Sequence, residues 1–418
     1  MFFSIVVPTY NRSKLLCRCL DSIKNQTFGD YEVLILDDCS SDDTSEVVKK
    51  YTSDERFEYI RFEKNQGFGD KTIKWAQDKG LFKGEWFIEI CDDDILSGDK
   101  VLEKIFYKVK NDSGVKCAVV DLAYNYGGID IFYKYDNENI SDVLVYDELS
   151  KDIKNKIDNT FAIAWKMKFF MEYDYCNSEK YNCRDVYTEL SYPKIYKEAQ
   201  KILYLKDEYY MFSATPNARR KYLDYYNWIV SSGLLCADIQ DKEGMYQRLK
   251  RSYTEPGLML GAFFDWGAEE LARALSTFAG NEVFPKILRQ FARIYQEQYN
   301  EKLMSYYVDF NNSLMSEGER NEAISRAKNI VVYCENSWTS QICDYLKNKG
   351  KNILYIADDE KEGYKNYQDI LKEKDLIDLV FIASGAPKVI YQILQKLKPR
   401  ENNIKVATLI MKDTYETN

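Results

Sequence analysis

Short apolar runs alternate with helical segments through the first hundred residues, and this rhythm constrains the fold more than any other feature. Four runs have the length and composition of buried strands: 2–7, 32–36, 57–62 and 86–90. Helical spacing of apolar residues and capping side chains predict helices between them: 13–23, 44–50 and 71–77. Strands that alternate with short helices are typical of a parallel α/β sheet, so this part of the chain is predicted to be α/β.

Polar side chains follow three of these strands. Pro8-Thr9-Tyr10 ends the first, Asp37-Asp38 the second and Asp92-Asp93-Asp94 the fourth. Parallel strands bind ligands beyond their carboxyl ends, so we expect the three segments to converge. Three adjacent carboxylates are tolerated when a divalent cation or a cationic partner neutralises them. The alternative is an acidic, solvated turn that caps the next helix.

Composition limits the function classes. The net charge of -9 argues against nucleic acid as a partner, because phosphate-binding surfaces need clustered Lys and Arg. The chain has no histidine, so a general base must be Asp, Glu, Lys, Tyr or Cys, and a histidine-ligated zinc site is excluded.

Ten cysteines without a C-x-x-C pair suggest a reducing compartment. With no signal peptide or membrane-spanning stretch in view, we expect a cytoplasmic protein, and peripheral contact with the inner membrane face stays open.

The length of 418 residues predicts two or three domains, and we expect boundaries at 1–214, 215–325 and 326–418. The middle block is predicted to be helical, over 222–235, 258–278 and 284–307. The last block alternates strands and helices again, as in a small Rossmann-like unit. A dinucleotide site there would need glycines after its first strand, but the sequence has Cys334-Glu335-Asn336-Ser337-Trp338. A structural role, or homo-oligomer formation through the C-terminal regions, is therefore favoured.

Three motifs in order, each at a strand end, resemble those of the family 2 glycosyltransferases with the GT-A fold: Val7-Pro8-Thr9-Tyr10-Asn11-Arg12, Leu36-Asp37-Asp38-Cys39-Ser40 and Asp92-Asp93-Asp94. The similarity is good over residues 3–110, thinner to 215 and absent beyond. The resemblance implies a GT-A nucleotide-sugar-binding domain, followed here by the helical region and the Rossmann-like α/β domain.

The resemblance also implies site residues. Asp93 and Asp94 would hold Mn²⁺ or Mg²⁺ bridging the donor diphosphate, and Asp37 with Asp38 would bind uracil or ribose. The nucleotide-sugar-binding set is Pro8, Thr9, Tyr10, Arg12, Asp37, Asp38, Lys71 and Asp92. Asn65-Gln66-Gly67 matches a loop near the base. For the two aspartates after the second strand the alternative is an ordinary turn, and for Lys71 it is a solvated helix lysine.

The family places its catalytic base in a Glu-Asp pair that opens a helix after the metal motif. Asp185 matches the aspartate, whereas Arg184 replaces the glutamate. A guanidinium close to Asp185 would lower its pKa and weaken it as a base. Asp185 could instead only open a helix, and Glu189 and Asp174 are alternative bases.

These features predict an inverting, metal-dependent glycosyltransferase. It would move a sugar from a UDP-sugar donor to a hydroxyl of a surface polysaccharide or glycolipid, so the acceptor is a saccharide or lipid-linked saccharide. One alternative is a sugar-phosphate nucleotidyltransferase, an enzyme class that needs a Gly-rich loop with a basic residue after the first strand; the segment Val7-Pro8-Thr9-Tyr10-Asn11 is not such a loop. The other is a scaffold that binds a nucleotide sugar without transferring it.

Overall fold

The computed structural model describes residues 1–67, 69–110, 112, 114–133, 141–150, 153–154, 157, 161–172, 195–213, 277, 281–397 and 404–412. The chain forms two compact units. The first comprises residues 1–124 and 132–213, and the second comprises residues 125–131 and 214–418. Each unit has its own sheet.

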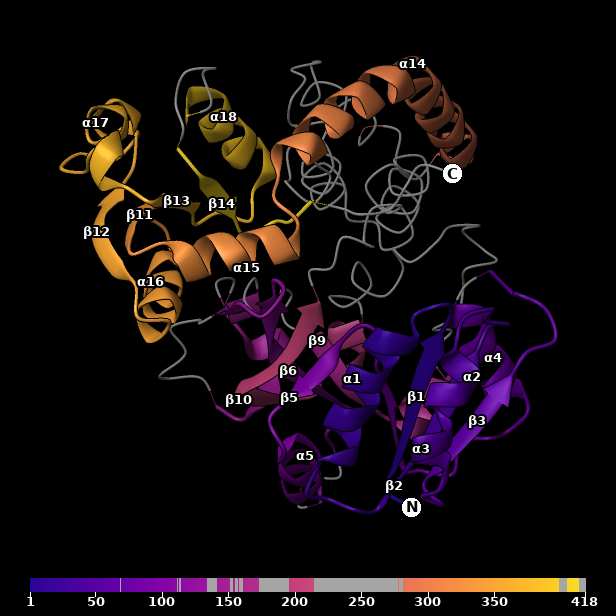
Figure 1. The fold of residues 1–418 in the computed structure, drawn as a ribbon. Coiled ribbons are helices and arrows are strands. Elements are labelled where there is room, and N and C mark those ends of the chain that lie inside the picture. Colours follow the sequence, from indigo (N-terminus) through magenta and orange to yellow (C-terminus); the bar gives the residue numbers. More distant parts are fainter. Residues whose placement is uncertain are drawn as a thin grey trace. The chain divides into compact units, whose positions relative to one another are not determined.

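The first unit is built on a ten-stranded mixed sheet with the order β3-β2-β1-β4-β9-β6-β10-β5, to which β7 and β8 add at β6 and β10 (Figure 1). Its strands are β1 (Phe3–Thr9), β2 (Tyr31–Asp37), β3 (Phe57–Arg61), β4 (Trp86–Glu89), β5 (Ile95–Ser97), β6 (Cys117–Asn125), β7 (Asp130–Phe132), β8 (Val143–Val145), β9 (Phe161–Lys166) and β10 (Lys201–Ser213). Its helices are α1 (Ser13–Lys24), α2 (Thr44–Val47), α3 (Lys49–Thr52), α4 (Gly69–Asp78), α5 (Val101–Val109) and α7 (Met167–Glu172), with a 3₁₀ turn η1 (Tyr146–Glu148).

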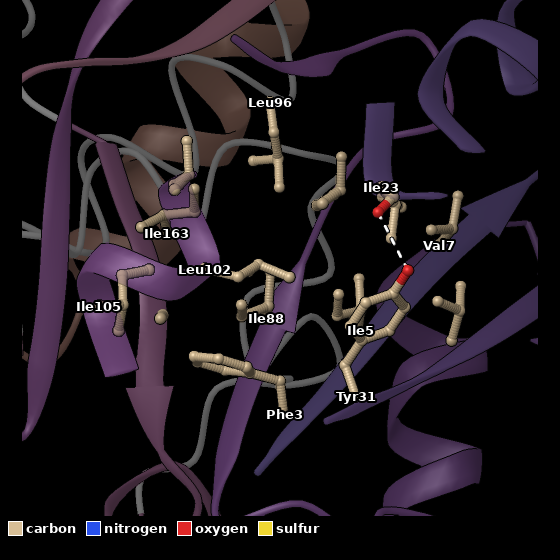
Figure 2. Packing of buried hydrophobic residues seen from close by; sticks show 14 of the residues in the cluster. Phe3, Ile5, Val7, Ile23, Tyr31, Ile88, Leu96, Leu102, Ile105 and Ile163 are labelled. Atoms are coloured by element: carbon tan, nitrogen blue, oxygen red, sulfur yellow. Dashed lines mark hydrogen bonds between the residues drawn. The ribbon is translucent and has the colours of Figure 1, made fainter. Parts of the chain in front are cut away.

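One of the two hydrophobic clusters of this sheet lies against α1 and α5, and the other includes residues of α4 and α7. One face of β1 contributes Phe3, Ile5 and Val7, all fully buried, and Figure 2 shows them beside Tyr31 of β2. The Tyr31 hydroxyl donates to the carbonyl of Ile23 at 3.1 Å, so this large ring is buried with its polar atom satisfied (Figure 2). The apolar spacing that predicted α1 therefore corresponds to its buried face.

The predicted parallel arrangement applies to β1, β2, β3 and β4, which pair in parallel. The rest differs, since β9 pairs antiparallel with both β4 and β6, and β10 pairs antiparallel with β5 and β8. One local prediction was wrong: the helix predicted over 44–50 is two short helices, α2 and α3. The N-cap of α1 is Arg12. Ser13 is the first helical residue, and its main-chain N–H donates to Asp42 at 3.1 Å.

The second unit contains a four-stranded parallel sheet with the order β12-β11-β13-β14. Its strands are β11 (Asn329–Tyr333), β12 (Asn352–Ala357), β13 (Leu379–Ile382) and β14 (Val406–Thr408). Its helices are α14 (Phe284–Ser313), α15 (Glu317–Arg326), α16 (Thr339–Asn348), α17 (Tyr367–Lys372) and α18 (Pro387–Leu397), with a 3₁₀ turn η5 (Lys374–Leu376). This alternation is the Rossmann-like pattern that the sequence predicts.

The three-domain division stays a prediction, because helices predicted over 222–235 and 258–278 lie almost wholly outside the described residues. The third predicted helix of that block corresponds to α14. Among the helices that the structure describes, none is both long and apolar enough to span a bilayer.

Candidate active site

The ends of β1, β2 and β4 lie side by side, as the sequence predicts. Thr9 is in register with Asp37 across β1 and β2, and the Asp38 N–H donates to the Thr9 carbonyl at 2.9 Å. On the other side, the Ile90 N–H donates to the carbonyl of Val6 at 3.0 Å. The segments that follow these strands therefore start from one edge of the sheet.

Thr9, Arg12, Asp92 and Asp93 form one polar network at this edge. The Thr9 hydroxyl donates to Asp92 Oδ2 at 2.7 Å, and Arg12 Nη1 donates to Asp92 Oδ1 at 3.0 Å. The same Nη1 lies 3.0 Å from Asp93 Oδ2. Asp92 is only 4% exposed, so its charge needs this hydroxyl and this guanidinium. Eighty-three residues separate Thr9 from Asp92 in the sequence, yet the fold joins them directly.

In both Asp92 and Arg12, burial and the opposite charge of the partner shift the pKa in opposite directions. Burial raises the pKa of Asp92 to about 6, the neighbouring Asp93 charge adds to this, and the Arg12 charge opposes it. For Arg12, burial lowers the pKa, but the carboxylates of Asp92 and Asp93 outweigh burial and raise it above the ordinary value. Arg12 is thus the fixed cation of this edge.

Asp94 is held from another strand. Its Oδ2 accepts a hydrogen bond from the Tyr210 hydroxyl at 3.0 Å, and its Oδ1 accepts one from the Ser213 N–H at 3.0 Å. The Tyr210 oxygen also accepts from the Cys91 N–H at 3.1 Å, so one buried ring fixes both ends of the acidic segment. Tyr210 was not among the residues predicted from the sequence, because its role depends on the pairing of β10 with β5.

Cys91, Asp93 and Asp94 have the donor atoms of a metal site. One ligand atom from each lies within 4.8 Å of the other two, and Asp93 is the more accessible of the two carboxylates. Carboxylate oxygens suit Mg²⁺ or Mn²⁺, and each can still bind an ion while it accepts one hydrogen bond. The residues present therefore fit a hard divalent cation, and the thiol adds a softer third ligand.

Asp37 supports the loop that follows β2. It is fully buried, and its carboxylate accepts from the Ser40 N–H at 2.8 Å and from the Tyr59 hydroxyl. Arg61 Nε lies 3.7 Å from the same carboxylate. With these partners Asp37 organises the turn, and its contact with a nucleotide stays a prediction.

Asp38 is joined to the loop 65–67. Its carboxylate accepts from the Gln66 N–H at 2.6 Å and the Gly67 N–H at 3.1 Å, and its carbonyl accepts from Asn65 Nδ2 at 3.1 Å. Gly67 has a φ of +93°, a conformation that favours glycine. The loop that resembles a base-binding segment is therefore held against the second strand end, where the sequence motif expects it.

The remaining predicted residues fall in three situations. Pro8 lies beside the start of α4, since a Cβ on Gly69 would be 3.2 Å from the Pro8 ring. Tyr10 is 47% exposed, and Lys71 is exposed on α4. Asp185 and its alternatives Glu189 and Asp174 lie outside the described residues, so their roles stay predictions.

Asn11 was missed by the sequence reasoning, although it stands inside the first motif. Its φ is +53°, and its side-chain oxygen accepts from the Ser41 N–H at 2.7 Å and the Asp42 N–H at 3.3 Å. Asparagine tolerates this left-handed conformation better than most residues, which is the signal that could have identified it. Asn11 thus ties the turn after β1 to the turn after β2.

Comparison with known proteins agrees with this arrangement. Residues 4–173 match the model of glycosyl transferase family 2. Residues 4–173 are therefore identified as a family 2 glycosyltransferase domain. The matched stretch contains β1, β2 and β4 and the segments that follow them, whereas Tyr210 and Ser213 of β10 lie beyond it. The mixed sheet of the first unit is a GT-A-like α/β sheet.

Curated relatives include the glycosyltransferase GlyG of Streptococcus pneumoniae, 26% identical over 225 residues, which cover 50% of this chain and 69% of GlyG. The poly(ribitol-phosphate) beta-N-acetylglucosaminyltransferase TarS of Staphylococcus aureus is 33% identical over 99 residues, or 23% of this chain and 17% of TarS. A GalNAc(5)-diNAcBac-PP-undecaprenol beta-1,3-glucosyltransferase of Campylobacter jejuni is 39% identical over 100 residues, or 23% of this chain and 31% of that enzyme.

A crystal structure of TarS superimposes with a TM-score of 0.47 at 18% identity, covering 69% of this chain and 55% of TarS. The chain thus spans a large part of GlyG but less than a third of the other two curated relatives.

Proposed function

We propose that this glycosyltransferase is an inverting, metal-dependent enzyme. It moves a sugar of the hexose or N-acetylhexosamine type from a UDP-sugar to a hydroxyl of a surface polysaccharide or glycolipid. The observation that carries the proposal is the group of Cys91, Asp93 and Asp94 at the edge where β1, β2 and β4 end. TarS, an N-acetylglucosaminyltransferase, and the Campylobacter enzyme, a glucosyltransferase, support the sugar type.

Negative charge grows on the phosphate oxygens as the nucleoside diphosphate departs. A Mg²⁺ or Mn²⁺ ion on Asp93 and Asp94 would supply the charge that offsets it. Arg12 adds a fixed positive charge beside them. Asp92, which accepts a hydrogen bond from Thr9, holds that guanidinium in place. A site with preset charges needs no reorganisation during the reaction, which is why it favours the transition state.

The nucleoside is assigned to the edge beside β2. Asp38 and the loop 65–67 would receive the base and ribose, with Asp37 fixing the turn beneath them. Pro8, Tyr10 and Lys71 complete the proposed donor-binding set. Each contributes at a strand end or at the start of α4, the region in which parallel sheets bind their ligands.

The acceptor hydroxyl needs a base, for which we propose Asp185. In a single displacement, the acceptor oxygen forms a bond to the anomeric carbon while the bond from that carbon to the diphosphate oxygen breaks. The hydroxyl proton passes to the Asp185 carboxylate, and the bonding electrons leave with the UDP. The configuration at the anomeric carbon therefore inverts.

The proposal includes a cytoplasmic location, with a lipid-linked acceptor reached by peripheral contact with the membrane, and self-association through the C-terminal regions. Nucleic acid is left out as a partner because the net charge of -9 opposes binding to a polyphosphate.

One assay panel tests the proposal. UDP release from a set of UDP-sugars is measured with Mn²⁺ and with a chelator, for the native protein and for Asp94→Asn, Asp185→Asn and the exposed control Asp99→Asn. We expect Asp94→Asn and chelation each to cost about a hundredfold or more in rate. Asp185→Asn should keep stabilisation by UDP with Mn²⁺ but lose transfer by orders of magnitude.

Asp99→Asn should match the native protein in both rate and stabilisation. A native protein that UDP and Mn²⁺ stabilise, but that releases no UDP from any sugar donor, would instead be a binding scaffold. Near-normal turnover by Asp185→Asn would move the base to Glu189 or Asp174.

A further inference from the structure

The turn between β6 and β7 belongs to the second compact unit, although both strands lie in the sheet of the first. Residues 125–131 form this turn, with φ of +58° at Gly127 and +86° at Gly128. Arg320 of α15 donates Nη2 to the carbonyls of Tyr126 at 2.8 Å and Gly127 at 2.7 Å. Arg320, which lies 194 positions after Tyr126 in the chain, therefore binds main-chain carbonyls of the turn.

Arg320 is a buried cation that the structure pairs with carbonyl oxygens. It is 1% exposed, and its Nη1 donates to the carbonyl of Leu409, just after β14, at 3.1 Å. Within the described residues it donates to these three main-chain oxygens, and Nε is buried without a partner. Burying a guanidinium is costly unless its hydrogen bonds are specific, so its position indicates recognition of the turn.

The turn lies where a sheet of this kind binds its ligands. The sheet has the order β12-β11-β13-β14, so the chain runs from β11 to one side and then returns to the other side at β13. Parallel sheets bind ligands beyond the carboxyl ends of the two strands at which the order reverses, here β11 and β13. Trp338 follows β11 and Gly385 follows β13, and a Cβ on Gly385 would be 2.5 Å from the Trp338 ring. The same Cβ would be 3.0 Å from the Tyr126 hydroxyl oxygen. The side chains of Trp338 and Tyr126 therefore lie beside Gly385 at this edge, and Tyr126 belongs to the turn.

A second set of contacts, inside the first unit, begins at the residue before the turn. The ring of Tyr124 stacks on Phe212 with centroids 5.3 Å apart, and Phe212 packs edge-on against Tyr210 at 5.0 Å. Tyr210 is the residue whose hydroxyl donates to Asp94. A peptide bond joins Tyr124 to Asn125, so restraint of the turn also restrains Tyr124.

We propose that Arg320 is a positioning residue of the glycosyltransferase site. It docks the turn 125–131 at the ligand edge of the C-terminal sheet, and this restrains the aromatic contacts that orient Asp94. The C-terminal unit then uses the edge where related sheets hold nucleotides to hold a segment of its own chain. The proposal rests on the proposed function only for the metal role of Asp94.

The test compares Arg320→Met and Arg320→Lys with Arg326→Lys, an exposed arginine of the same helix that pairs with Glu322. Hydrogen exchange is measured at the amides of 125–131 and at the Ser213 amide, which donates to Asp94. We expect exchange in the turn to rise about tenfold or more in both Arg320 variants, with faster exchange at Ser213. Mn²⁺ affinity, measured with the metal alone by electron paramagnetic resonance, should fall about threefold to tenfold.

A third variant, Tyr124→Leu, leaves Arg320 in place and removes the ring contact with Phe212. It should keep the turn protected but reproduce the changes at Ser213 and in Mn²⁺ affinity, and it decides the matter if the Arg320 variants do not fold. Turn amides that stay protected in Arg320→Met would overturn the docking. Faster hydrogen exchange in the turn together with an unchanged exchange rate at the Ser213 amide would overturn the positioning role. If the native protein binds no Mn²⁺, the metal proposal fails separately, and the exchange measurements still decide this one.

Discussion

The three adjacent aspartates after β4 meet three different environments, and this divides their work. Asp92 is buried against a hydroxyl and a guanidinium, and Asp94 is buried against a phenol and a main-chain N–H. The Asp93 side chain keeps 21% of its surface exposed, compared with 5% for Asp92. We therefore propose that an incoming ion meets the Asp93 carboxylate first, whereas the hydrogen bonds of its two neighbours fix the segment that carries it.

Part of this environment could be predicted from the sequence. Thr9 and Asp92 both follow strands of one parallel layer, so periodicity alone indicated that they meet. Tyr210 and Ser213 could not be predicted as partners of Asp94, because they reach it through an antiparallel pairing of β10 with β5, 116 and 119 residues away. Pairing over such a distance leaves no local pattern in the chain.

Asp121 of β6 gives a prediction on pH dependence. The carboxyl is 2% exposed, and burial raises its pKa above the ordinary value, although the hydrogen bond from Tyr204 at 2.7 Å opposes this. The folded state then keeps the Asp121 proton to a higher pH than the unfolded state does. The contribution of Asp121 to stability is full below its unfolded-state pKa of about 4 and falls as the pH rises through the folded-state pKa.

Urea unfolding of the native protein and of Asp121→Asn, measured from pH 4 to pH 7, checks this. The native protein should lose stability relative to the variant as the pH rises, and Asp99→Asn should follow the native protein. A difference between Asp121→Asn and the native protein that is constant across this range would contradict the role of burial.

At the scale of the elements, the strands that carry the site are tied together at their opposite ends. The Ser4 hydroxyl of β1 donates to Glu32 Oε1 of β2 at 2.6 Å and accepts from the Gly84 N–H, just before β4, at 2.8 Å. The Lys83 N–H donates to the same Glu32 oxygen at 2.7 Å. With this end fixed, the carboxyl ends can carry unfavourable charge without loss of register.

Gly84 gives the prediction for this tie. A Cβ at Gly84 would lie 2.4 Å from the Ser4 nitrogen and 2.6 Å from the Phe3 carbonyl carbon, which are main-chain atoms that cannot move aside cheaply. We expect Gly84→Ala to lower the free energy of unfolding by about 1–3 kcal/mol through overpacking. Gly29→Ala is the matched control, because a Cβ there meets nothing within 4 Å, and its effect should stay within about 0.5 kcal/mol. Equal stabilities for the two variants in urea unfolding would show that the strands tolerate separation at this end.

The sequence predicted individual strands better than their pairing. The run 32–36 corresponds to β2, because a buried parallel strand is apolar throughout. The short strand β5 was missed, since three residues carry no usable pattern. The role of Arg320 could not be predicted, because a lone arginine on an amphipathic helix reads as a solvated charge.

For the whole molecule, the two compact units share one chain in an interleaved way. The second unit takes in residues 125–131 from the middle of the first, so neither unit is a simple continuous segment. The predicted boundary at residue 214 describes where the strand β10 ends but not this exchange. The positioning role proposed for Arg320 depends on that interleaving, and the metal site proposed for the first unit would give this role its function.

The central claim is that a divalent cation and a uridine diphosphate meet at the edge defined by Thr9, Asp38 and Asp93. A crystal grown with Mn²⁺ and UDP, measured at a wavelength with strong anomalous scattering from manganese, tests it most directly. We expect an anomalous peak about 2.0–2.3 Å from carboxylate oxygens of Asp93 or Asp94, with the diphosphate on the same ion and the base beside Asp38. Bound UDP with manganese at another place, or with none at this edge, would contradict the account.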